Sequence, residues 1–381
     1  MAADPNNTTR KKALLILGWM VFPGLLAGAA AWVMSNWHIP TRIQANLTVT
    51  RVAFTPGGMD AVPILERAAN FRSLTFERFS QVALSPKKVE VMGAASSMRA
   101  NDRANLANSL QKSGEIILLG EMNHRPVITI ESVNEKAESA GRLESIAAMP
   151  DTDVIFDANH GSSHTFTIKL EKSSASPTLL LINPFKLTAF NVSSKELDAA
   201  QLKINPIVLQ IDLREDNPLV KVGSESGELI VTFTPVKNVV VNFLEDSGVP
   251  ISQISFSKQN KSGKAESALV SVGEVTYMDF PDIKKSIDLA EHESFSLENL
   301  NNAKIKQLRY DSEKAGFVVR LEGEAGVILT GSGSFTKDHR LTLFDRLWHD
   351  SRLIVIFSIM AWVCSATVAA YKMYREEKNR A

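Results

Sequence analysis

The sequence predicts a mainly β protein: an antiparallel β-sandwich or jelly-roll-like central region with small helical insertions, flanked by N- and C-terminal transmembrane helices. Two long apolar blocks without charge lie near the ends of the chain, and between them apolar and polar residues alternate with a period of two. The 381 residues include 42 basic and 42 acidic side chains. A chain without net charge is not typical of nucleic-acid-binding proteins, which need a basic surface.

The two apolar blocks cover residues 13–35 and 353–371, and neither contains a charged residue. Each is close to the length of about 20 residues that crosses the hydrocarbon of a bilayer. We therefore expect two transmembrane helices, although Ala27-Gly28-Ala29 also fits a signal-peptide cleavage site. Aromatic residues, which favour the membrane interface, lie near the block ends: Trp32, Trp37, Trp348, Tyr371 and Tyr374.

The charges flanking these blocks predict an orientation. Residues 1–12 contain three basic and one acidic residue, and residues 372–381 contain four basic and two acidic residues. The remaining 35 basic and 39 acidic residues lie in 36–352, which is therefore net acidic. Because basic tails favour the cytoplasmic side, we expect a two-pass protein of the bacterial cytoplasmic (inner) membrane with an extracytoplasmic centre.

Half-buried strands are expected throughout that centre. In the run 164–171, Phe166, Ile168 and Leu170 alternate with polar residues, and the run 207–213 repeats the pattern. Three stretches instead suggest helices, at 97–112, 134–149 and 194–202. The predicted organisation is a cytoplasmic tail (1–12), a transmembrane helix (13–35), a first β lobe (36–150), a second β lobe (151–335), a basic amphipathic juxtamembrane segment (336–352), a second transmembrane helix (353–371) and a cytoplasmic tail (372–381).

Small residues recur every fourth position in both apolar blocks. Gly24 and Gly28 share this spacing in the first block, as do Ala361, Ser365 and Ala369 in the second. Small residues let helix backbones approach closely in lipid, so these positions predict packing of the two helices or self-association. The alternative is that Gly and Ala are simply common in membrane helices.

Candidate chemistry is confined to one polar cluster. Asp157, His160 and His164 could supply three metal ligands, but the Asn, Gly and Ser between them fit a turn between two strands equally well. The single cysteine, Cys364, rules out an internal disulfide and a cysteine-based metal cluster. With no nucleophile elbow, zinc-peptidase or phosphate-loop motif, we expect no catalytic residue, no metal and no cofactor.

Three functions fit these features. The first is a non-catalytic, membrane-anchored scaffold or assembly protein whose β domain binds envelope proteins or glycans, or self-associates. The second is a ligand-responsive membrane effector or sensor, in which the β domain controls the two helices. The third is an envelope hydrolase that uses His160 or His164.

Overall fold

The computed structural model divides the chain into two compact units. The end unit consists of residues 1–41, 279–283 and 340–381, and the β unit consists of residues 42–278 and 284–339. The residues that the structure describes are 28–29, 32–65, 69–79, 81–84, 86–93, 99–112, 116–119, 127–131, 141–150, 152–158, 165–172, 180–183, 189–192, 198–199, 202–203, 207–213, 220–223, 228–236, 240–259, 265–279, 285–291, 293–332, 335–349, 355, 358–359, 362, 365, 368 and 372.

Strands dominate these residues, which confirms the mainly β prediction. The helices whose bounds fall within the described residues are α2 (Ala100–Lys112) and α3 (Leu343–His349). The strands are β1 (Thr41–Val49), β2 (Arg51–Pro56), β3 (Val62–Pro63), β4 (Ala69–Glu77), β5 (Gln81–Leu84), β6 (Pro86–Gly93), β7 (Ile116–Leu119), β8 (Val127–Glu131), β9 (Gly141–Ala148), β10 (Thr152–Ala158), β11 (Phe166–Lys172), β12 (Leu180–Asn183), β13 (Ala189–Val192), β14 (Asp198–Ala199), β15 (Leu202–Lys203), β16 (Ile207–Leu213), β17 (Val220–Gly223), β18 (Glu228–Pro235), β19 (Val241–Ser255), β20 (Ser257–Gln259), β21 (Ala265–Ser267), β22 (Gly273–Tyr277), β23 (Ser286–Leu289), β24 (Ser294–Asp311), β25 (Gly316–Ser332) and β26 (Phe335–Asp338).

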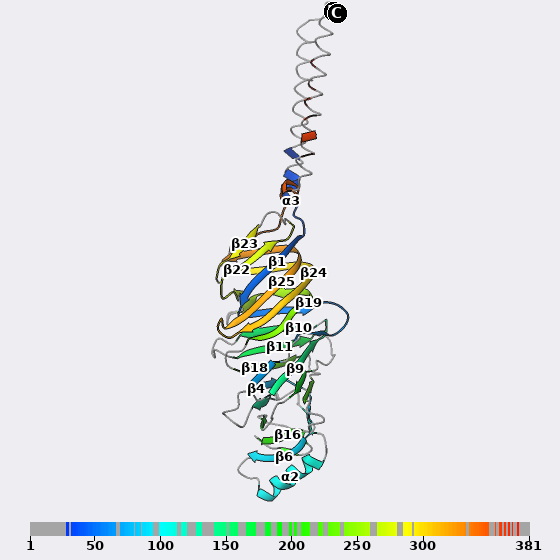
Figure 1. The fold of residues 1–381 in the computed structure, drawn as a ribbon, viewed down its shortest axis with the longest axis vertical. Helices are drawn as coiled ribbons and strands as arrows, with labels where there is room; N and C mark the ends of the chain where they lie inside the picture. The colour runs from blue at the N-terminus through cyan, green and yellow to red at the C-terminus, as the bar shows by residue number, and fades with distance from the viewer. Residues whose placement is uncertain are drawn as a thin grey trace, which may run out of the picture. The chain divides into compact units, whose positions relative to one another are not determined.

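One sheet of 22 strands contains most of them, and its described pairings are antiparallel. From β23, which has one partner among the described strands, the sheet runs through β22, β1, β25, β24, β19, β2, β10, β11 and β18 to β4. Figure 1 shows these strands following one another, from β22 and β1 to β18 and β4. Beyond β4 the sheet divides, with β8, β13, β16 and β6 in one branch and β9, β12, β17, β5 and β7 in the other.

Alternation of apolar and polar residues explains the position of the core. In β11, Phe166, Ile168 and Leu170 are buried while the residues between them are partly exposed, as the sequence predicted. The Phe166 ring lies 4.6 Å from the Tyr310 ring and 5.5 Å from the Phe317 ring, between centroids. Since β10, β2, β19 and β24 separate β11 from β25 in the sheet, this contact means that the sheet curls around a shared aromatic core.

Two of the three predicted helices are wrong where the structure describes them. α2 confirms the first helix within its described residues. In the second stretch, Gly141–Ala148 forms β9, because pairing with β4 and β12 outweighs the helical propensity of its Leu, Glu and Ala residues. In the third, Asp198–Ala199 pairs with Leu202–Lys203.

The lobe boundary at residue 150 gains no support from strand pairing. β10 lies between β2 and β11, and β9 pairs with β12, so strands from both predicted lobes share one sheet. In the predicted juxtamembrane segment 336–352, β26 covers the first residues and α3 begins at Leu343. The two-lobe division and the sandwich or jelly-roll form stay predictions.

Among the described residues, no helix has both the length and the apolar character needed to cross a membrane. Most residues of the predicted helices 13–35 and 353–371, and of the predicted tails, lie outside the described part of the chain.

Candidate functional site

Residues 37–41 and 341–343 of the end unit lie side by side, and we call this site the neck. The Ile39 amide donates to the Leu341 carbonyl at 3.0 Å, and the Leu343 amide donates to the Trp37 carbonyl at 2.8 Å. Between these bonds, His38 and Thr342 form an antiparallel bridge. Main-chain hydrogen bonds therefore join two segments that lie about 300 positions apart in the sequence.

A buried hydroxyl completes the neck. The side chain of Thr41 is fully buried, and its Oγ1 donates to the Ile39 carbonyl at 3.1 Å. The same oxygen accepts from the amide of Leu341, also buried, at 3.3 Å. Because an unpaired buried amide is costly, Thr41 satisfies a group that the neck would otherwise leave without a partner.

Helix α3 begins immediately after the neck. The Asp345 amide donates to Oγ1 of Thr342 at 3.0 Å, and the Thr342 amide donates to Oδ2 of Asp345 at 3.0 Å. This reciprocal pair is a capping box, which satisfies amides that the first helical turn leaves open. The Asp345 carboxylate also lies in the first turn, where the helix dipole favours negative charge.

A helical segment also ends immediately before the neck. Residues 32–36 are helical, and the Trp37 amide donates to the Val33 carbonyl at 2.9 Å. The side chains of Ser35 and Asn36 donate to the Trp32 carbonyl, at 2.9 and 2.8 Å. Helical residues therefore adjoin the neck on both of its segments: residues 32–36 come before Trp37, and α3 begins at Leu343.

Large apolar side chains are exposed along the described helical positions of the end unit. Trp32 is 69% exposed, and Trp37, the first residue of the neck, is 61% exposed. Val355, Ile359, Trp362 and Val368 are likewise more than half exposed. Exposed apolar surface of this kind marks contact with a membrane or with another protein.

The residues predicted to pack the helices are only partly described. Gly28 is helical, and a Cβ built there would meet nothing within 4 Å. Ser365 is helical, whereas Gly24, Ala361 and Ala369 lie outside the described residues. Packing of the two helices through these positions stays a prediction.

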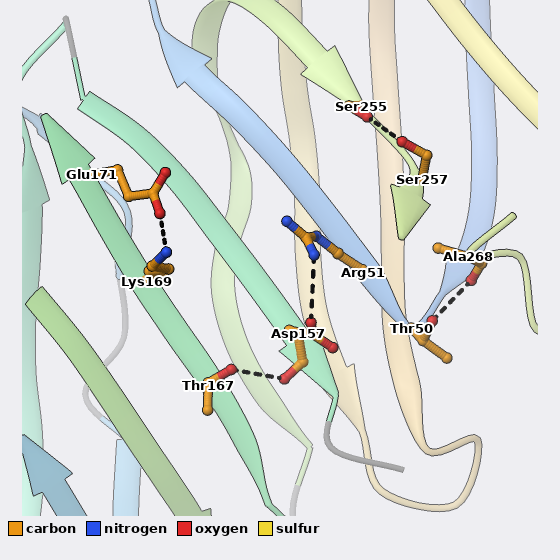
Figure 2. Close-up of polar contacts among 9 residues, drawn as sticks. All are labelled: Thr50, Arg51, Asp157, Thr167, Lys169, Glu171, Ser255, Ser257 and Ala268. Atoms are coloured by element: carbon orange, nitrogen blue, oxygen red, sulfur yellow. Dashed lines mark hydrogen bonds and ion pairs between the residues drawn. The ribbon is translucent and has the colours of Figure 1, made fainter. Parts of the chain in front are cut away.

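The structure places Asp157, the predicted metal candidate, on the surface of the sheet in β10. It lies opposite Arg51 of β2, with 3.8 Å between Oδ2 and the guanidinium, and its carbonyl accepts from Thr167 (Figure 2). His160 and His164 lie outside the described residues. Within the described ranges, no three His, Cys, Asp or Glu residues are grouped so that they could hold a metal ion.

A polar cluster around His339 lies in the β unit, and the sequence pattern did not predict it. The Tyr277 hydroxyl donates to the His339 carbonyl at 2.6 Å, and His339 Nε2 lies 2.9 Å from Oγ1 of Thr330. Burial lowers the pKa of His339, Lys337 lowers it further, and Glu293 and Asp338 oppose these effects. The neutral imidazole is therefore favoured in the fold.

One signal in the sequence could have pointed to the neck. Thr41 occupies the same phase as the apolar residues Ile43, Ala45 and Leu47, so a polar side chain stands at a position that faces the core. A buried hydroxyl needs a partner, and that partner is Leu341. No feature of the sequence indicates where the partner lies.

Comparison with protein-family models, with curated proteins and with solved structures found no match.

Proposed function

We propose that this protein is a non-catalytic scaffold of the bacterial cytoplasmic membrane, anchored by helices at 13–35 and 353–371. Its β unit, outside the cytoplasm, binds envelope proteins or glycans. The curl of the sheet gives that unit an aromatic core, and the residues that alternate with the buried ones remain partly exposed.

The hydrogen bonding of the neck carries this proposal. Two helices that leave one domain at adjacent points can enter the same bilayer side by side, and the pairing of 37–39 with 341–343 provides such adjacent points. The helical residues 32–36 overlap the end of the first apolar block, and α3 at 343–349 comes just before the second. Since the chain crosses the bilayer twice, both tails lie on the same side.

The exposed apolar side chains support a lipid environment for the end unit. Val355, Ile359 and Trp362 follow a spacing of four and three residues, so they lie on one side of a helix. Exposing this stripe to water would be unfavourable, whereas lipid tails would cover it. Trp32 and Trp37 suit the level of the headgroups, where indole rings are enriched.

Labelling of single cysteines in intact cells tests this topology. Each variant carries Cys364→Ser, with Val272→Cys at an exposed position just before β22 or Lys372→Cys after the second apolar block. A membrane-impermeant maleimide should label Val272→Cys in intact cells, and Lys372→Cys only after permeabilisation. The reverse pattern, or equal labelling of both in intact cells, would refute the proposed orientation.

The natural cysteine supplies the control. Cys364 lies inside the predicted second helix, so it should react only after the membranes are dissolved in denaturing detergent. Labelling of Cys364 in intact membranes would place this segment in water and contradict the anchor.

A further inference from the structure

We infer that the edge strand β23 pairs with β23 of a second copy of the chain, antiparallel, about a two-fold axis at Ile287. The two sheets would then join edge to edge. This inference rests on the β unit alone and holds whether or not the helices cross a membrane.

β23 has one partner among the strand pairings that the structure describes, and that partner is β22. The Tyr277 amide donates to the Lys285 carbonyl at 3.0 Å, so these two residues form a hydrogen-bonded pair. Antiparallel ladders alternate hydrogen-bonded and non-hydrogen-bonded pairs. Ile287 therefore directs its main chain towards β22, while the amides and carbonyls of Ser286 and Asp288 point away from it.

These outward groups are self-complementary. Ser286 and Asp288 lie symmetrically on either side of Ile287, so a two-fold axis at Ile287 sets each residue opposite the other in the second copy. Each pair exchanges two main-chain hydrogen bonds, which gives four in all. A register centred on Ser286 or on Asp288 would leave one outward residue of each β23 without a partner in the other β23.

The side chains favour the same register. Ile287 ends a row of core-facing residues that begins with Ala45 and Val275, and it remains partly exposed at the sheet edge. Pairing places it beside Ile287 of the second copy and buries both. On the outer face, Asp288 is already opposite Glu274 in β22. A register centred on Asp288 would add a second carboxylate directly opposite, which is destabilising, whereas the register at Ile287 sets Asp288 against a serine.

Two other short strands carry residues that discourage such pairing. β3 ends in Pro63, which lacks an amide donor, and β26 carries Lys337. Proline and lysine are common means of protecting a sheet edge. β23, with the sequence Ser-Ile-Asp-Leu, has neither, and Lys285 just before it lies over the ring of Tyr277, 5.7 Å from the centroid.

Disulfide trapping of the full-length chain tests the register. In a Cys364→Ser background, Ile287→Cys should cross-link to itself, because non-hydrogen-bonded pairs have Cα atoms ~4.5 Å apart. Asp288→Cys alone should not, since two such residues would lie ~8 Å apart, given a strand spacing of ~4.8 Å and a rise of ~3.3 Å per residue. A disulfide needs Cα atoms within about 7 Å.

A mixture provides a second, independent check. Chains with Ser286→Cys mixed with chains with Asp288→Cys should form a cross-linked heterodimer, since this pair lies ~5.5 Å apart. Neither variant should cross-link as strongly alone. The register centred on Ile287 predicts that Ile287→Cys cross-links, that Asp288→Cys alone does not, and that the mixture does. No other register predicts all three results.

A proline variant distinguishes a loss of pairing between copies from a loss of folding. The Asp288 amide points away from β22, so Asp288→Pro removes a donor that only the second copy uses. It should reduce cross-linking at Ile287→Cys at least about tenfold and, at a dilution at which the chain is monomeric, leave the thermal midpoint of unfolding unchanged. The matched variant Asp288→Ser keeps the amide and should keep the cross-link.

Three results would overturn the inference. Equal cross-linking of Ile287→Cys and Asp288→Cys would indicate random collision of the chains. Cross-linking of Ile287→Cys to a different protein would show that another partner occupies the edge. A monomer by native mass measurement, with no cross-link at Ile287→Cys, would show that the edge stays free.

Discussion

Replacing Thr41 by valine should loosen the neck without changing its shape. Valine has nearly the same volume as threonine, but it can neither accept from the Leu341 amide nor donate to the Ile39 carbonyl. Both Thr41 and Leu341 are buried, so the amide loses a partner in a place that water does not reach. A buried donor left unpaired costs about 1–3 kcal/mol. Opening of the neck should become easier by that amount.

Hydrogen exchange at the Leu341 amide measures this opening directly. Under native conditions the exchange rate follows the free energy of local opening, so a loss of about 1–3 kcal/mol corresponds to exchange roughly 5- to 150-fold faster. Amides of the β unit, such as those of β11, should exchange as before. The control Thr41→Ser keeps the hydroxyl, and it should protect Leu341 much better than valine does.

Two outcomes would refute this reasoning. An unchanged Leu341 exchange rate in Thr41→Val would mean that the hydroxyl does not hold the neck closed. An equal increase in Thr41→Val and Thr41→Ser would mean that the methyl group, rather than the hydrogen bonds, matters.

Three further predictions concern the β unit. Phe166→Ala should lower the free energy of unfolding by about 3–5 kcal/mol in urea titration, and Phe166→Leu by much less, because the ring packs against four other aromatic rings; equal losses would contradict this. Ala315 has φ of 47°, so Ala315→Gly should raise that free energy by about 0.5–1 kcal/mol, whereas a decrease would mean that the turn carries no strain. Because burial lowers the pKa of His339, the fold favours the neutral ring. The stability that the neutral His339 ring contributes is complete above about pH 6.5, and it is lost as the pH falls through the lowered pKa. His339→Gln should flatten the pH dependence of unfolding in this range, and an identical profile would exclude His339 as its source.

The fold could be predicted where a pattern is local. The alternation of Phe166, Ile168 and Leu170 fixes which face of β11 is buried, and that prediction is confirmed. β9 could not be predicted in this way, because Gly141–Ala148 mixes small, charged and apolar residues without strict alternation. Its strand conformation follows from its neighbours β4 and β12, which are distant in sequence.

The neck and the His339 cluster depend on contacts between distant residues. Thr41 and Leu341 are 300 positions apart, and Tyr277 and His339 are 62 apart. Each residue alone resembles an ordinary threonine, tyrosine or histidine of a β-rich chain. Only the path of the strands brings the hydroxyl of Thr41 to the buried amide that it satisfies.

Extraction of membranes with alkaline carbonate tests the central claim, that both chain ends leave the neck as helices anchored in one bilayer. The full-length chain should remain in the membrane pellet, together with known integral membrane proteins, while peripheral proteins are released. Recovery of the intact chain in the supernatant would contradict the account.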